Sequence, residues 1–198
     1  MRTTIAAFVF AITPALAFAQ SAGEVQKLFE AGRFQQVIDA APADAEPAVV
    51  YMAAQSQQKL GADAQAVTLY SRLAERPESD AWHFVGESGR LLVEGQVDPA
   101  ADAARHAVEM AGGLSEAHFQ LGLVLARLES WQMAASEFDT AAMINPTNAY
   151  AHYYGGLMHY RANRPDRMAI HFEQFLKLAP DAPERPEVMQ IMRTVRGR

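Results

Sequence analysis

The sequence repeats with a period of 34 residues from position 47 to position 182, and this period limits the folds that the chain can adopt. A small residue recurs in every unit, at Ala54, Ser88, Gly122 and Gly156. A second recurring position marks a turn between two helices and holds Gly61, Gly95, Glu129 and Asn163. A unit of this length cannot bury its apolar faces alone, so consecutive units have to stack on one another.

Each unit is predicted to be a pair of antiparallel helices. Alanine is abundant and β-branched residues are sparse, which favours helix along the whole chain. Two helices can cross closely only where side chains are small, so we expect Gly122 to face Ala134. Leu121 and Phe138 would fill the gaps on either side of this crossing. Pro146 ends the second helix of its unit, because proline cannot continue a helix.

The unit at 115–148 carries a set of residues in the order and spacing of a known repeat, namely Leu121-Gly122, Ala134, Phe138, Ala141 and Pro146. In this respect it resembles the tetratricopeptide repeat family, which fills these positions with Leu-Gly, Ala, an aromatic residue, Ala and Pro. The same register continues through the neighbouring units. The resemblance implies an all-α helical-repeat solenoid, wound as a right-handed superhelix, with a C-terminal capping helix.

The expected organisation is a leader at 1–19, a shortened helical hairpin with a linker at 20–46, repeats at 47–80, 81–114, 115–148 and 149–182, and a capping helix at 183–198. Repeat 81–114 is the weakest match, because Glu87 stands where an apolar residue is expected and Trp82 is displaced from the register. The capping helix is predicted from one apolar stripe, formed by Val188, Ile191, Met192 and Val195.

The first 19 residues have the pattern of an export signal. Arg2 supplies the positive start, residues 5–16 form an apolar run, and Ala17-Phe18-Ala19 is a small-x-small cleavage site. A membrane-spanning helix needs about 20 apolar residues, and this apolar run is shorter. We therefore expect cleavage after Ala19 and a periplasmic protein, the alternative being an uncleaved N-terminal anchor.

Composition and motifs argue against several classes of function. The formal charge of −6 argues against a nucleic-acid partner, and the absence of cysteine excludes disulfides, thiol nucleophiles and cysteine-zinc sites. The sequence contains neither a Gly-x-Ser-x-Gly elbow nor a glycine-rich phosphate loop. These observations favour a non-catalytic protein without a cofactor and without stable membrane insertion.

The histidines give only a weak indication of a metal site. His118 and His152 occupy the same position of neighbouring repeats, where a bulky packing residue is expected. His152 and His159 lie about 10 Å apart along one helix, which is too far to share an ion. No carboxylate joins them at ligand spacing in the sequence, so no metal site is predicted.

The resemblance implies that the first helix of each repeat lines a concave groove. The residues that this assigns to a partner-binding groove are Tyr51, Gln55, Lys59, Phe119, Leu123, Arg127, Tyr150, Tyr153, Leu157, Tyr160 and Arg161. Tyrosine and arginine are frequent in binding hot spots. The lysine and asparagine of chaperone-binding members are missing, so a partner of the Hsp70 or Hsp90 tail type is not expected.

These predictions favour a scaffold or assembly factor that holds a protein or peptide of the cell envelope in its groove. The alternative is an accessory subunit that positions a periplasmic enzyme, such as a peptidoglycan-active one, or its substrate.

Overall fold

The computed structural model describes residues 21–196, so the expected leader lies outside the described part. This part consists of helices joined by short turns and contains no strand. The helices are α1 (Ala22–Glu30), α2 (Phe34–Asp39), α3 (Pro47–Lys59), α4 (Asp63–Ala74), α5 (Ala81–Val93), α6 (Val97–Met110), α7 (Ser115–Arg127), α8 (Trp131–Ile144), α9 (Ala149–Arg161), α10 (Pro165–Leu178) and α11 (Arg185–Arg196). The expected all-α helical-repeat solenoid is confirmed.

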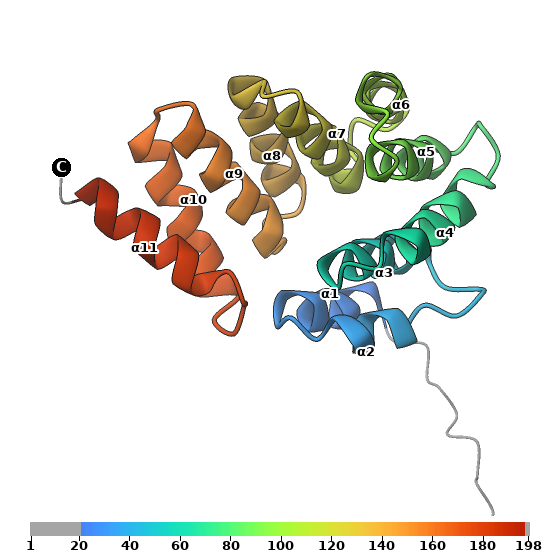
Figure 1. The fold of residues 1–198 in the computed structure, drawn as a ribbon, viewed down its shortest axis with the longest axis horizontal. Coiled ribbons are helices and arrows are strands. Elements are labelled where there is room, and N and C mark those ends of the chain that lie inside the picture. Colours follow the sequence, from blue (N-terminus) through green and yellow to red (C-terminus); the bar gives the residue numbers. More distant parts are fainter. Residues whose placement is uncertain (1–20, 197–198) are drawn as a thin grey trace, which may run out of the picture.

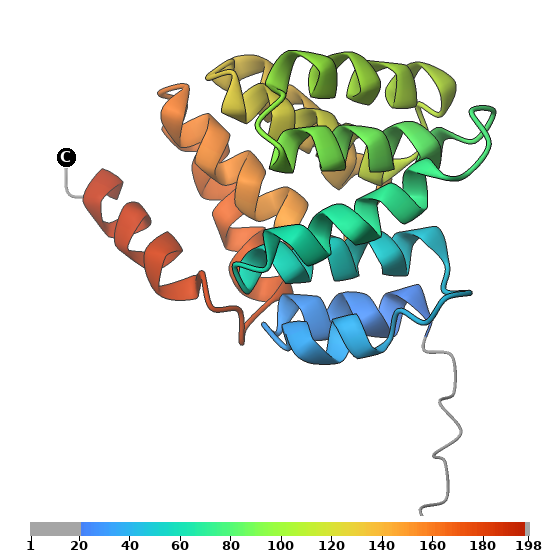
Figure 2. The ribbon, with the colours of Figure 1, turned by 45° about the vertical axis from the view of Figure 1, so that its right-hand side comes forward.

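Consecutive helices pair in an antiparallel manner, and the pairs stack into an arc (Figure 1). The hairpin of α1 and α2 lies at one end, followed by the pairs α3–α4, α5–α6, α7–α8 and α9–α10. Figure 2 shows the same arc turned by 45°, with the N-terminal hairpin brought under α3. The last helix, α11, lies beside α10 and buries Val188 and Met192 of its apolar stripe.

The turn inside each pair has a left-handed residue. The positive φ angles are 71° at Gly32, 73° at Gly61, 80° at Gly95, 56° at Glu129 and 55° at Asn163. The residue after each of them donates its N–H to a carbonyl five positions back, at 2.8–2.9 Å. This bond closes a Schellman motif, which ends the first helix and turns the chain into the second.

Within the third and fourth repeats, a glycine of the first helix packs directly on a phenylalanine ring of the second. A Cβ added at Gly122 would lie 2.9 Å from the ring of Phe138, and one at Gly156 would overlap the ring of Phe172. The atoms nearest to that Cβ position all belong to the ring of Phe138, which follows Ala134 by one turn of α8. The space that Gly122 leaves is therefore filled by an aromatic ring, and the predicted approach of Gly122 to Ala134 stays a prediction.

Two neighbouring repeats approach closely where α4 contacts α5. A Cβ added at Gly86 would lie 2.6 Å from the carbonyl oxygen of Tyr70 and 2.7 Å from the backbone nitrogen of Ala74. One turn further, a Cβ at Gly89 would lie 2.5 Å from the ring of Tyr70. Backbone meets backbone at this crossing, so the orientation of the weakly matching repeat 81–114 depends on the absence of a side chain.

None of the helices in the described part is both long and apolar enough to cross a bilayer.

The crossing at Gly86 predicts opposite effects for two Gly-to-Ala substitutions. Gly86→Ala should lower the free energy of unfolding by about 1–3 kcal/mol, because the new methyl group meets backbone that cannot move aside. Gly23→Ala, in α1, has no neighbour within 4 Å and should raise it by about 0.4–1 kcal/mol. Urea unfolding of the two variants measures both. A stability of Gly86→Ala equal to that of the wild type would contradict this packing.

Candidate functional site

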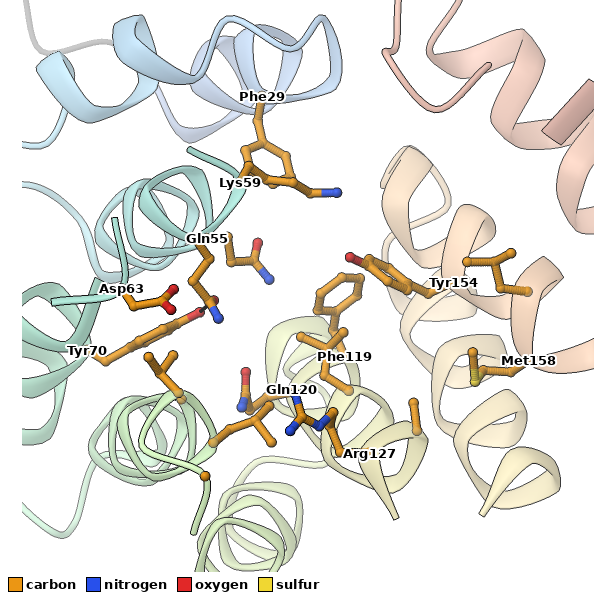
Figure 3. Close-up of a pocket in the computed structure, with 18 residues that line it drawn as sticks. Phe29, Gln55, Lys59, Asp63, Tyr70, Phe119, Gln120, Arg127, Tyr154 and Met158 are labelled. Carbon is orange, nitrogen blue, oxygen red and sulfur yellow. Dashed lines mark hydrogen bonds between the residues drawn. The ribbon is translucent and has the colours of Figure 1, made fainter. Parts of the chain in front are cut away.

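The inner side of the arc contains a cavity of about 490 Å³ (Figure 3). Its wall comes from α1, α3, α4, α5, α7 and α9 and from the turn after α5. The lining residues are Phe29, Gln55, Gln58, Lys59, Asp63, Tyr70, Gly89, Leu92, Val93, Gly95, Phe119, Gln120, Leu123, Ala126, Arg127, Tyr154, Leu157 and Met158. Residues from both ends of the arc thus face one space.

The wall of this cavity is mainly apolar and carries two cations and one carboxylate. Leu123, Leu157 and Tyr154 are half-buried in it. Arg127 lies at the C-terminus of α7, is exposed, and forms no ion pair with another described residue. Of the two cations, Arg127 is therefore the one that remains available to a ligand, and its guanidinium can bind a carboxylate in a planar, two-bonded geometry.

A second cavity of about 260 Å³ adjoins the first, because Phe29, Gln55 and Phe119 line both. It differs in charge, since Glu30 and Glu116 belong to its wall. Burial raises the pKa of both carboxyl groups above the usual value. The inner surface is therefore cationic at the Arg127 end and acidic at the Glu30 end.

The arc is closed by contacts between the N-terminal hairpin and α9. The rings of Phe29 and Tyr150 lie with their centroids 4.8 Å apart. The backbone N–H of Ala149, at the start of α9, donates to Glu30 Oε1 at 2.9 Å, and Gln26 Nε2 donates to the carbonyl oxygen of Thr147 at 2.8 Å. The Glu30 carboxylate thus supplies an acceptor at a helix N-terminus, where an anion is stabilised.

A second closing contact, which we call the Lys59 clasp, joins α3 to the segment before α11. Lys59 Nζ donates to Glu184 Oε1 at 2.7 Å, and the Tyr150 hydroxyl donates to Glu184 Oε2 at 2.7 Å. Burial alone would lower the pKa of Lys59. The interactions with Tyr154 and Glu184 raise it by more, so the net pKa of Lys59 lies above its usual value. Lys59 Nζ also lies 5.0 Å from the centre of the Tyr150 ring, a cation–π distance.

A buried hydrogen-bond chain connects three repeats behind the cavity. The hydroxyl of Tyr51 in α3 donates to Gln120 Oε1 in α7 at 2.9 Å, and Gln120 Nε2 donates to Ser88 Oγ in α5 at 3.1 Å. All three side chains are buried. Because a buried polar group is costly unless it is paired, this chain fixes the relative positions of the first helices of three repeats.

The structure places the sequence-derived groove residues in three groups. Gln55, Lys59, Phe119, Leu123, Arg127 and Leu157 line the larger cavity, and Tyr51 and Tyr150 line the smaller one. Tyr153 is buried, stacks near Phe175 and donates its hydroxyl to Glu187 of α11 at 2.9 Å. Tyr160 and Arg161 are exposed and lie outside both cavities, with Arg161 over the ring of Trp131. These last three residues do not contribute to the cavity walls.

Sequence reasoning missed Phe29, Asp63 and Tyr154 as cavity residues. Phe29 belongs to the N-terminal hairpin, which lies outside the 34-residue period, and Asp63 begins a second helix rather than a first one. Tyr154 lies between two groove positions of α9 and was not among those that the family resemblance assigns. The aromatic density of α9 was the signal that could have included it.

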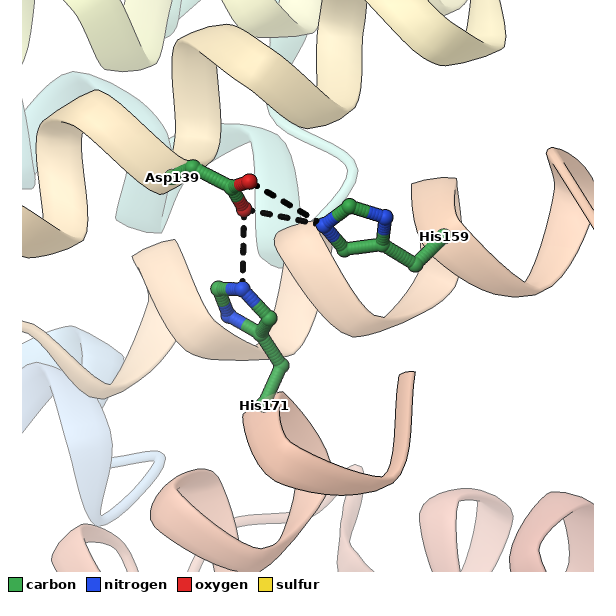
Figure 4. A group of neighbouring side chains, drawn as sticks. All are labelled: Asp139, His159 and His171. Carbon is green, nitrogen blue, oxygen red and sulfur yellow. Dashed lines mark hydrogen bonds and ion pairs between the residues drawn. The ribbon is translucent and has the colours of Figure 1, made fainter. Parts of the chain in front are cut away.

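The described part also holds one group of side chains that converge as metal ligands would (Figure 4). Asp139 of α8, His159 of α9 and His171 of α10 offer ligand atoms that all lie within 4.8 Å of one another. Neither the spacing of histidines within one helix nor their equivalent positions in neighbouring repeats indicates this group, because its three members come from three helices.

The architecture defines the chain as a helical-repeat solenoid that surrounds an internal groove. Residues 48–79 match the family model of the tetratricopeptide repeat. A TPR repeat-containing protein of Methanocaldococcus jannaschii is 28% identical over 127 residues, which make up 64% of this chain and 21% of that protein. This chain therefore spans about a fifth of the length of that relative.

Solved structures of tetratricopeptide-repeat proteins share the fold. TTC0263, a thermophilic TPR protein of Thermus thermophilus, superposes with a TM-score of 0.59 at 17% identity, over 88% of this chain and 98% of that one. The first TPR of Spaghetti, bound to an HSP90 peptide, gives 0.58 at 15% identity, over 62% and 97%. YrrB, a TPR protein with an unusual peptide-binding site, gives 0.54 at 17% identity, over 85% and 88%. Residues 48–79 thus match a tetratricopeptide repeat, and the described part shares the helical-repeat fold of tetratricopeptide-repeat proteins.

The Lys59 clasp predicts that one carboxylate holds the arc closed. Glu184→Gln should lower the free energy of unfolding by about 1–3 kcal/mol, because the side chains of Lys59 and Glu184 are only 26% and 12% exposed. Glu94→Gln, the control, breaks an i,i+4 ion pair with Arg90 at the C-terminal end of α5 and should cost about 0.3–0.5 kcal/mol.

Urea unfolding measures the stability of the two variants, and small-angle scattering measures their radius of gyration. The clasp predicts a larger radius for Glu184→Gln alone. Equal stability and equal size for both variants would show that the clasp does not hold the arc.

Proposed function

We propose that this chain is a non-catalytic binding protein that holds a short segment of a protein partner in the larger cavity. The observation that carries this proposal is the combination of an apolar wall with the unpaired Arg127 in a cavity of about 490 Å³. Cavities of about 300–1,000 Å³ with a few fixed polar groups are typical of ligand sites.

The cavity size limits what the partner can insert. Because the arc is closed at α1, α9 and the Lys59 clasp, an entire helix does not fit between its walls, and a few side chains of an extended segment do. Leu123 and Leu157 would contact apolar side chains of that segment. Arg127 would pair with an acidic side chain or a chain-terminal carboxylate.

Two relatives support a peptide ligand. The first TPR of Spaghetti is bound to an HSP90 peptide, and YrrB has a peptide-binding site. Their identity with this chain is 15% and 17%, so they support the type of site and not the identity of the partner. The partner of this chain would be a protein of the cell envelope, and the chain would act as a scaffold or assembly factor there.

The envelope setting rests on the leader-like pattern of residues 1–19, with Arg2, an apolar run and the Ala17-Phe18-Ala19 site. The chain is expected in the periplasmic fraction with Gln20 as its first residue. Fractionation of cells that express the full chain, followed by N-terminal sequencing, measures this. Retention in the membrane with Met1 still present would favour an anchored protein instead.

Two arginines at the same repeat position provide a matched test of the site. Arg127→Ala should weaken peptide binding about thirtyfold. This loss corresponds to about 2 kcal/mol of binding free energy, the typical cost of truncating a hot-spot residue. Arg161→Ala should change it less than about twofold, because Arg161 lies outside both cavities. Peptides selected from a random displayed library against the full chain would serve as probes, measured by fluorescence anisotropy.

The selected peptides should carry an acidic group beside apolar residues, and both variants should keep the helicity and melting temperature of the wild type. A larger loss for Arg161→Ala than for Arg127→Ala would place the site outside the cavity.

A further inference from the structure

We propose that Asp139, His159 and His171 form a binding site for one divalent transition-metal ion, with Zn²⁺ as the best fit. The three side chains come from three consecutive helices, α8, α9 and α10, and their ligand atoms point toward one another (Figure 4). Asp139 Oδ1 lies 3.0 Å from His159 Nε2 and 2.8 Å from His171 Nε2. Neither the repeat fold nor the proposed peptide site requires this convergence.

The two carboxylate–imidazole distances suit a tetrahedral ion, and all three ligand atoms lie within 4.8 Å of one another. Zinc binds imidazole nitrogen and carboxylate oxygen at about 2.0–2.2 Å, which places neighbouring ligand atoms roughly 3.3 Å apart in a tetrahedral site. The two carboxylate–imidazole distances need to lengthen by only a few tenths of an ångström to admit the ion. Imidazole and carboxylate ligands together suit Zn²⁺ and its neighbours rather than Mg²⁺ or Ca²⁺, which prefer oxygen ligands alone.

The surroundings enclose the site on one side and leave it open on the other. The side chains of His159 and His171 are 2% and 10% exposed, whereas that of Asp139 is 33% exposed. An ion can therefore enter past the carboxylate and keep a water molecule as its fourth ligand. Gly155 makes room for one ligand, because a Cβ at this position would lie 2.8 Å from His171 Nδ1.

A contact within the third repeat shows the simpler arrangement, in which one imidazole meets one carboxylate. There His118 Nδ1 lies 2.7 Å from Glu137 Oε2, with side chains that are 10% and 25% exposed. Leu125 stands at the position equivalent to His159, so no second imidazole is present. Convergence of two imidazoles on one carboxylate is therefore a feature of the junction between the third and fourth repeats.

A bound ion would connect two repeats. Asp139 belongs to the third repeat, while His159 and His171 belong to both helices of the fourth. Met158, the neighbour of His159, lines the larger cavity together with Leu157. The ion would thus fix α9 against α8 and, through α9, the cavity wall that the proposed function uses.

The test uses the full chain without a histidine tag, freed of metal by a chelator and titrated with ZnCl₂ in a calorimeter. The wild type is expected to bind one Zn²⁺. Loss of a residue that only supports a metal ligand typically weakens metal binding about 10–100-fold. Asp139→Asn and His171→Gln remove proposed ligands, so each should weaken zinc binding by at least that factor. Glu137→Gln, the matched control in the same helix, removes the carboxylate of the single ion pair and should leave zinc affinity unchanged.

A second measurement decides the matter if the variants do not fold. X-ray absorption at the zinc edge of the loaded wild type should show two imidazole ligands and oxygen ligands at about 2.0–2.2 Å. The proposal is overturned if the wild type binds no Zn²⁺, if Asp139→Asn and His171→Gln bind it as tightly as Glu137→Gln does, or if the absorption spectrum shows fewer than two imidazoles. The first of these results would leave the group as two imidazoles in contact with one carboxylate.

Discussion

At Gly86, Gly122 and Gly156, helices pack against their neighbours with no side chain of their own at the point of contact. At Gly122 and Gly156 this admits a phenylalanine ring from the partner helix, and at Gly86 it brings two backbones together. Interiors are packed as densely as organic crystals, so the missing side chain fixes the distance between the helices. These close crossings set the spacing of helices in a stack whose fourth repeat reaches the N-terminal hairpin, where Phe29 meets Tyr150.

The closed arc explains why the inner surface is a cavity rather than an open groove. Phe29 meets Tyr150, Glu30 accepts from the N-terminus of α9, and Lys59 reaches Glu184, so segments more than a hundred residues apart in sequence share one wall. As a consequence, part of the aromatic surface, Tyr150 among it, is used for closure. What remains available to a partner is Arg127 and the leucines beside it.

The helix pairs and their turns could be predicted from the sequence, because the contacts that define them lie within one 34-residue unit. Glu129 and Asn163 illustrate this, since both take the left-handed turn conformation at the position where other units have glycine. The contact between the N-terminal hairpin and α9 could not be predicted, because a repeat pattern does not determine the angle between one repeat and the next. For the same reason Tyr153 was assigned to the groove, although it packs under α11, and the Asp139 group was missed because its members occupy different positions of different repeats.

A distance between the two ends of the arc shows whether the arc is closed. The sequence contains no cysteine, so Gln35→Cys and Gln174→Cys introduce the only two thiols for spin labels on exposed positions of α2 and α10. Pulsed electron resonance should give one narrow distance distribution, centred on the separation of these two sites in the closed arc. A broad distribution, or one centred at clearly longer distances, would show that the repeats form an open solenoid and would contradict the closed cavity.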